Sequence, residues 1–131
     1  MKKVLAIVYK EEEKQKRFLI LHRKLNWVGW ECLKETMEEN ESEEETVRRG
    51  MQEEINVKQF EIVKRKKIYI QLPYESTIER AFLIKIDADQ KIDISQNKSK
   101  EHDDYKWVSQ EEAEKLLTHK NITDVLKEIS H

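Results

Sequence analysis

The stretch TVRRGMQEEINV, residues 46–57, combines a helical pattern with two adjacent glutamates and an unexpected glycine. Val47, Met51 and Ile55 recur every four residues, so they share one side of a helix and are expected to face the core. Gly50 lies in the same helix and is one of only two glycines in the chain. Because glycine costs a helix about 1 kcal/mol relative to alanine, helix propensity does not explain its presence.

Short apolar runs and polar segments alternate along the rest of the chain, as in strands joined by loops. Two serines, each followed three residues later by glutamate, form capping boxes, so helices are expected to begin at about Ser42 and after Ser109; Asn121 is expected to cap a third helix. Strands are expected at residues 4–9, 18–22, 57–72, 78–86 and 105–108, a bent extended segment at 26–33, and a polar loop at 87–104. This order predicts an α/β (or α+β) fold, a mixed sheet covered by helices, in one domain spanning residues 1–131.

Length, cysteine content and charge indicate what class of protein this chain is. With 131 residues the chain is long enough to bury one core without disulfides, and its single cysteine, Cys32, is expected to be a small buried hydrophobe. Lys and Arg (25) nearly balance Asp and Glu (27), so there is no overall basic field for nucleic acid. No apolar run approaches the length of a membrane span and no signal-peptide pattern is present, so we expect a cytoplasmic protein without a membrane partner.

Acidic residues concentrate around the helix. Ten glutamates fall between Glu31 and Glu54, both included. Glu53 and Glu54 follow Gly50 by three and four positions, so all three share one side of the helix, and Glu41 precedes its start. Carboxylates of this kind can hold Mg²⁺, or alternatively Mn²⁺, while a pyrophosphate completes the coordination shell. From spacing alone, a solvated charged face is the competing interpretation.

The segment from residue 35 to residue 57 resembles the signature of the Nudix hydrolases, Gx5Ex7REUxEExGU, in which U is a bulky aliphatic residue. The matching positions are Glu41, Arg49, Met51, Glu53, Glu54 and Val57. Three positions depart from the signature: Glu35 and Asn56 replace glycines, and Gly50 replaces the glutamate after the arginine. The flanks FLILHRKLNWVGWE (18–31) and EHDDYKWVSQEEAEKLL (101–117) are similar to the dinucleoside-polyphosphate (diadenosine tetraphosphate) hydrolase branch of that family.

The resemblance implies an α/β/α sandwich and Mg²⁺-dependent attack of water on a nucleoside diphosphate derivative, with asymmetric cleavage of diadenosine polyphosphates in this branch. By the same resemblance, Glu53 and Glu54 are metal ligands and Glu101 matches a loop glutamate that joins the metal or acts as base. Arg49 matches the arginine that orients the carboxylates of the signature. The catalytic residues that it implies are therefore Glu101, Arg49 and Glu53.

Gly50 has three explanations at this level. It can admit close packing of the helix against a strand. The catalytic base can have moved to a loop carboxylate such as Glu101. Selection on catalysis can have relaxed, which the losses at Glu35 and Asn56 support, because glycine at both positions serves backbone turns. Asn56 is the milder change, since Asn tolerates the left-handed conformation found just past a helix, and Glu35 is expected to fit its turn less easily. Because a positioned base contributes about 10²–10⁴-fold, we expect slow or altered hydrolysis with the base at Glu101.

Four residues are candidates for substrate contacts. Arg23 and Lys34 flank the signature and can bind phosphate, while Tyr74 and Tyr105 can stack on a nucleobase; ordinary surface charge is the competing interpretation of Arg23 and Lys34. The three tryptophans are expected in the core. No histidine pair has zinc spacing, so His22 and His102 are expected to be structural. The basic run at 64–67 suits a solvated strand edge, with an RNA contact as the alternative.

The sequence thus favours a Nudix-type phosphoanhydride hydrolase acting on a dinucleoside polyphosphate or related nucleotide, as a monomer or homodimer. The rival hypothesis is a non-catalytic Nudix domain that binds nucleotide or RNA. A third is a pyrophosphohydrolase of capped or triphosphorylated RNA, which only the basic run at 64–67 supports.

Overall fold

The computed structural model describes residues 1–97 and 99–130 and contains one mixed sheet with three helices. The strands are β1 (Lys2–Glu12), β2 (Gln15–Arg23), β3 (Gly29–Glu31), β4 (Leu33–Thr36), β5 (Glu61–Leu72), β6 (Ser76–Lys85) and β7 (His102–Val108). The helices are α1 (Glu43–Ile55), α2 (Gln110–Leu116) and α3 (Lys120–Ile129). None of the described helices has the length and apolar character needed to span a membrane.

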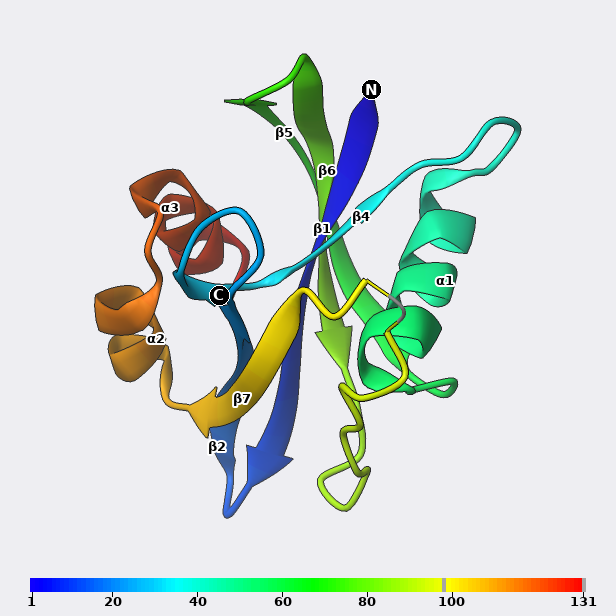
Figure 1. The fold of residues 1–131 in the computed structure, drawn as a ribbon. Helices are drawn as coiled ribbons and strands as arrows, with labels where there is room; N and C mark the ends of the chain where they lie inside the picture. Colours follow the sequence, from blue (N-terminus) through cyan, green and yellow to red (C-terminus); the bar gives the residue numbers. More distant parts are fainter. Residues whose placement is uncertain (98, 131) are drawn as a thin grey trace.

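The sheet runs in the order β3-β2-β1-β6-β5, with β4 paired to β1 and β7 paired to β2. Strands β1 and β6 are parallel and the other pairs are antiparallel. Helix α1 lies on one side of the sheet, and α2 and α3 lie on the other (Figure 1). The predicted α/β/α sandwich with a mixed sheet is therefore confirmed.

Strand β1 lies between two hydrophobic cores. Three odd-numbered side chains pack with α2 and α3: Leu5, Ile7 and Tyr9. Three even-numbered side chains pack with α1 on the other face: Val4, Ala6 and Val8. A strand covered on both faces reads as an unbroken apolar run because every side chain is buried. This arrangement explains why residues 4–9 show no alternation of apolar and polar residues.

Helix α1 follows its sequence pattern closely. Val47, Met51 and Ile55 are completely buried, as predicted. The capping box at Ser42 is present, and the second one, at Ser109, starts α2. Asn56 ends α1 in the left-handed conformation, with φ 57°, which confirms the expectation that asparagine serves where the signature has glycine.

Several boundaries differ from the predictions; β1 and β2 extend beyond the predicted runs at both ends, and β6 begins two residues earlier and ends one residue earlier than predicted. Strand β5 begins at Glu61 rather than at residue 57, because Val57 still donates to the carbonyl of Met51 and closes the helix. Strand β7 begins at His102, since its polar first residues already pair with β2. Helix α3 is capped by His119 rather than Asn121, because the His119 carbonyl accepts the first amide hydrogen bonds of the helix.

Candidate active site

Arg49, on α1, gathers four carboxylates. Its Nε and Nη2 each lie 2.9 Å from an oxygen of Glu41, a two-pronged hydrogen bond that lowers the pKa of Glu41 to about 2. Its Nη1 lies 3.3 Å from Glu35 and 3.4 Å from Glu53, and its Nε lies 3.1 Å from the exposed Glu38. One guanidinium therefore faces four negative groups, which leaves a local excess of negative charge.

A second, more buried group lies beside the first and centres on His102. His102 Nε2 lies 2.7 Å from Glu31 Oε2, and its Nδ1 lies 3.4 Å from Glu54 Oε2. Asn97, in the loop before β7, donates to the same Glu54 oxygen at 2.5 Å. The His102 ring thus bridges two carboxylates whose residues are only 3% (Glu31) and 6% (Glu54) exposed.

Opposite charges hold this buried group in its ionised form. Burial alone would lower the pKa of His102, but the hydrogen bonds to Glu31 and Glu54 outweigh it and raise the pKa to about 9. Burial alone would raise the pKa of Glu31, but His102, Lys34 and Arg23 lower it to about 2. His102 is therefore an imidazolium at neutral pH and balances the buried carboxylates.

Glu101 adjoins this group from the end of the loop. Its backbone carbonyl accepts from the Lys24 amide at 3.0 Å, which fixes it beside the end of β2, and its carboxylate lies 3.3 Å from Arg23 Nη1. One ligand atom each of Glu54, Glu101 and His102 lies within 4.8 Å of the others. The carboxylate oxygens suit a hard cation such as Mg²⁺, whereas a protonated imidazole does not bind metal.

A pocket of about 460 Å³ opens next to these carboxylates. Arg23 connects the two regions, because it lines the pocket and also pairs with Glu31 and Glu101. Lys34 lines the pocket as well and lies 3.1 Å from Glu31 Oε1. Lys3, Trp27 and Tyr74 also line the pocket. Three cations and two aromatic side chains thus surround a space beside the acidic group.

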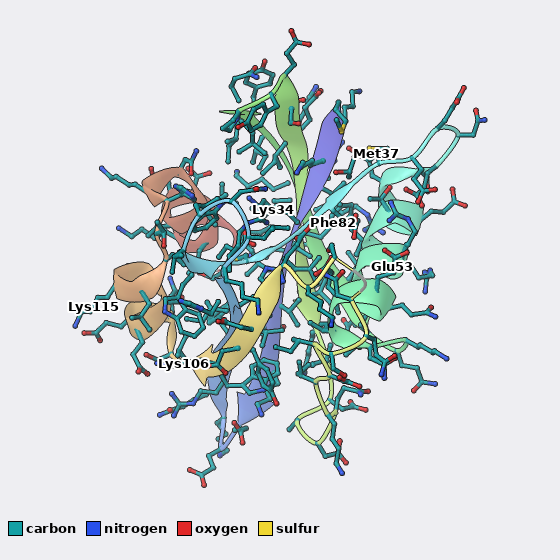
Figure 2. The ribbon with its side chains drawn as sticks, viewed as in Figure 1. Lys34, Met37, Glu53, Phe82, Lys106 and Lys115 are labelled. Carbon is teal, nitrogen blue, oxygen red and sulfur yellow. The ribbon has the colours of Figure 1, made fainter. Side chains whose placement is uncertain are left out.

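The structure brings together some of the predicted site residues and separates others. Glu54 and Glu101 meet at the buried group, whereas Glu53 is exposed and lies beside Arg49. Figure 2 labels Lys34 on β4, at the pocket, and Glu53 on α1, at the Arg49 cluster. Tyr74 lines the pocket and is 93% exposed, but Tyr105 packs against the core under α1 and is not among the lining residues.

Two expectations about single residues are wrong. Trp27 is not a core residue: it is half-buried in the pocket wall, with the Arg23 guanidinium 5.7 Å and the Lys34 ammonium 5.9 Å from its ring centre. Glu35 does not strain the backbone where the signature has glycine. It pairs with Val4 inside β4 and has no positive φ. His102, in turn, is more than a lone structural histidine, since it joins the two buried glutamates.

Sequence reasoning missed Glu31 and Asn97 as site residues. Glu31 had a signal, because a glutamate between Trp30 and Cys32 in an apolar stretch predicts a buried carboxylate that requires partners. Asn97 had none, since it lies within a polar loop where asparagine is ordinary.

Gly50 packs against β4. A Cβ atom built at Gly50 would lie 3.0 Å from Glu35 Cβ, 3.3 Å from Glu35 Cγ and 3.4 Å from Leu33 Cδ2. The glycine therefore admits a close approach of helix and strand, as the first of the three explanations requires. Burial raises the pKa of Glu35, and Glu54 and Glu53 add to this effect, while Arg49 and the Thr36 amide oppose it.

The sequence matches a known protein family over nearly its whole length. The family model described as NUDIX domain matches residues 1–128. The chain belongs to the Nudix family. No protein with a curated description matches the sequence.

Solved Nudix structures share the fold at low sequence identity. The Ap4A hydrolase of C. elegans in a binary complex has a TM-score of 0.84 and 20% identity, covering 98% of this chain and 94% of that one. The dihydroneopterin triphosphate pyrophosphohydrolase of E. coli has a TM-score of 0.74 and 18% identity, covering 98% and 93%. The Nudix domain of NrtR from Shewanella oneidensis, complexed with ADP ribose, has a TM-score of 0.72 and 16% identity, covering 99% and 86%.

The basic run at 64–67 lies apart from this site. It belongs to β5, the last strand of the sheet order, and its residues are absent from the described pocket lining. Arg65 pairs with Glu44, and Lys66 lies 3.2 Å from Glu128. These contacts match a solvated sheet edge protected by charge.

Proposed function

We propose that this Nudix domain, spanning residues 1–131, hydrolyses a phosphoanhydride bond of a dinucleoside polyphosphate or related nucleoside diphosphate derivative with the help of Mg²⁺ or Mn²⁺. The observation that carries the proposal is the junction at Arg23, where the acidic group of Glu54 and Glu101 meets a pocket lined by three cations. Carboxylates for a divalent cation and cations for phosphate oxygens are the two requirements of metal-assisted phosphoanhydride hydrolysis.

Each side chain has a role in this proposal. Glu53, Glu54 and Glu101 would hold the cation, which when bound neutralises phosphate charge and lowers the pKa of a bound water. Glu101 would also accept a proton from the attacking water; its contact with Arg23, a pocket residue, and its proximity to Glu54 support this role. Arg49 would orient the signature carboxylates Glu41 and Glu53, and it also pairs with Glu35.

The pocket suits a nucleotide with several phosphates. Arg23 and Lys34 offer hydrogen-bond donors to phosphate oxygens, and Lys3 adds a third cation. Trp27 in the wall and Tyr74 at the exposed edge can stack on a nucleobase, whereas Tyr105 packs under α1. The similarity in fold to an Ap4A hydrolase over nearly the whole chain makes diadenosine tetraphosphate the first substrate to test.

A non-catalytic nucleotide-binding domain is the second candidate, and one observation favours it. Gly50 lacks the carboxylate of the signature, and Glu54 Oε2 is already bonded to Asn97 and His102. A binder would take up the nucleotide in the same pocket without turnover.

The experiment that separates these functions measures products of diadenosine tetraphosphate by ion-exchange chromatography, with Mg²⁺, with Mn²⁺ and with neither. The expected result is metal-dependent product release that Glu54→Gln abolishes and Glu39→Gln, an exposed glutamate of the same segment, leaves unchanged. Tight nucleotide binding by calorimetry without any product, including from ADP-ribose and 5′-triphosphate RNA, would instead establish the binding function.

A further inference from the structure

Gly50 and Glu35 occupy complementary positions in the fold. In the signature, glycine stands at position 35 and glutamate at position 50, and this chain has the reverse. The two residues come from different elements, β4 and α1, yet the Cβ position of Gly50 is only 3.0 Å from Glu35 Cβ. The side chain of Glu35 therefore covers the place where a side chain on Gly50 would begin.

That place belongs to the acidic side of α1. Position 50 precedes Glu53 by three and Glu54 by four residues, so a side chain there would stand over both of them. Glu35 enters the same space from the strand. Its carboxylate lies 3.3 Å from Arg49 Nη1, the nitrogen that also contacts Glu53 at 3.4 Å.

Glu35 also retains a free ligand atom. Its Oε1 accepts from the Thr36 amide at 3.1 Å and pairs with Arg49, which fixes the carboxylate. Its Oε2 accepts no hydrogen bond from any residue that the structure describes. The side chain is only 14% exposed, so this oxygen is held in the site instead of moving freely in solvent.

We infer that Glu35 supplies, from strand β4, the carboxylate that the Nudix signature places on the helix, so that glutamate and glycine have exchanged positions without loss of the charge. This inference rests on the proposed metal-dependent function. It makes Glu35 an additional ligand for the divalent cation beside Glu53 and Glu54. It also explains both departures at once, since the Cβ of a glutamate at position 50 would lie 3.0 Å from Glu35 Cβ, a contact that requires one of the two to shift.

Mn²⁺ binding tests the inference without relying on turnover. The free ion is titrated with the native chain and with Glu35→Gln, Glu54→Gln and the control Glu39→Gln, and bound Mn²⁺ is followed by electron paramagnetic resonance. Glu35→Gln, which keeps the shape and removes the charge, should weaken Mn²⁺ binding by about tenfold or more, as should Glu54→Gln. Glu39→Gln should bind like the native chain.

The exchange itself is tested by restoring the signature. Gly50→Glu alone should lower the midpoint of thermal unfolding by about 5 °C, because its Cβ would lie 3.0 Å from Glu35 Cβ and its carboxylate would be added to the negative charges of Glu35, Glu53 and Glu54. The double variant Glu35→Gly with Gly50→Glu should recover both the midpoint and the Mn²⁺ affinity to within about threefold of the native chain.

Two results would overturn the inference. If Glu35→Gln binds Mn²⁺ as tightly as the native chain while Glu54→Gln does not, the metal site stands and Glu35 is no part of it. If the native chain itself binds no Mn²⁺ at millimolar concentration, the proposed metal-dependent function fails and the role of Glu35 fails with it.

Discussion

Replacing His102 by glutamine should destabilise the protein strongly and change how its stability depends on pH. The ring lies between Glu31 and Glu54, and its side chain is 6% exposed. Removing one member of a buried ion pair costs about 3–5 kcal/mol. Glu31 keeps Arg23 and Lys34 as partners and Glu54 keeps Asn97. We therefore expect the loss in free energy of unfolding to lie at the lower end of this range, about 3 kcal/mol.

The pKa of His102 leads to the same magnitude. A rise from 6.5 in the unfolded chain to about 9 in the folded protein corresponds to about 3 kcal/mol. Because the folded state holds the proton more tightly, this stabilisation is fully present below pH 6.5 and is lost as the pH rises toward 9. For 131 residues, a loss of about 3 kcal/mol lowers the midpoint of thermal unfolding by about 10 °C.

Urea unfolding at pH 6 and pH 9.5, followed by circular dichroism, measures both effects. The native chain should lose stability between the two pH values, and His102→Gln should be less stable at pH 6 and lose the His102 share of the pH dependence. His22→Gln is the matched control, because His22 pairs with the partly exposed Asp103 and should cost less than about 1 kcal/mol. Equal midpoints for His102→Gln and the native chain at pH 6 would refute the buried bridge.

Three further predictions concern the site and the helix. Glu101→Gln should abolish the metal-dependent turnover of diadenosine tetraphosphate while leaving the thermal midpoint within a few degrees of the native value; undiminished turnover would exclude Glu101 as base and ligand. Arg23→Lys should raise KM more than it lowers kcat, and steady-state kinetics measures the split. Arg23 contacts Glu31 and Glu101 through Nη1 and the Leu25 carbonyl through Nε, and a lysine has one ammonium group in place of these separate donors and of a two-pronged bond to phosphate. Asn56→Ala should lower the free energy of unfolding, measured with urea, by about 1 kcal/mol, whereas Asn56→Gly should leave it unchanged, because residue 56 has φ 57°. Equal stability of the two variants would contradict the helix-end assignment.

The acidic segment of this Nudix domain combines two kinds of carboxylate. Glu31 and Glu54 are buried and balanced by His102, whereas Glu35, Glu41 and Glu53 surround Arg49. His102 holds the two buried carboxylates in fixed positions at neutral pH. The carboxylates around Arg49 carry the excess negative charge that a divalent cation would compensate.

Much of the fold follows from local patterns in the sequence. The run at 4–9 is apolar on every residue because β1 is covered on both faces, and Val47, Met51 and Ile55 mark the buried side of α1. Caps and turn residues act over three or four positions, so both capping boxes and the left-handed Asn56 could be predicted from their neighbours. The frame of the signature could be identified for the same reason.

The arrangement of the site was decided by tertiary structure. Glu31 and His102 are 71 residues apart and meet because β2 pairs with both β3 and β7. No local pattern encodes that pairing, since it depends on which strands become neighbours in the sheet. The exchange of Glu35 and Gly50 is of the same kind. Along the sequence it is two separate departures from a signature, and only the packing of α1 on β4 brings the position of a Cβ atom on residue 50 to 3.0 Å from Glu35 Cβ.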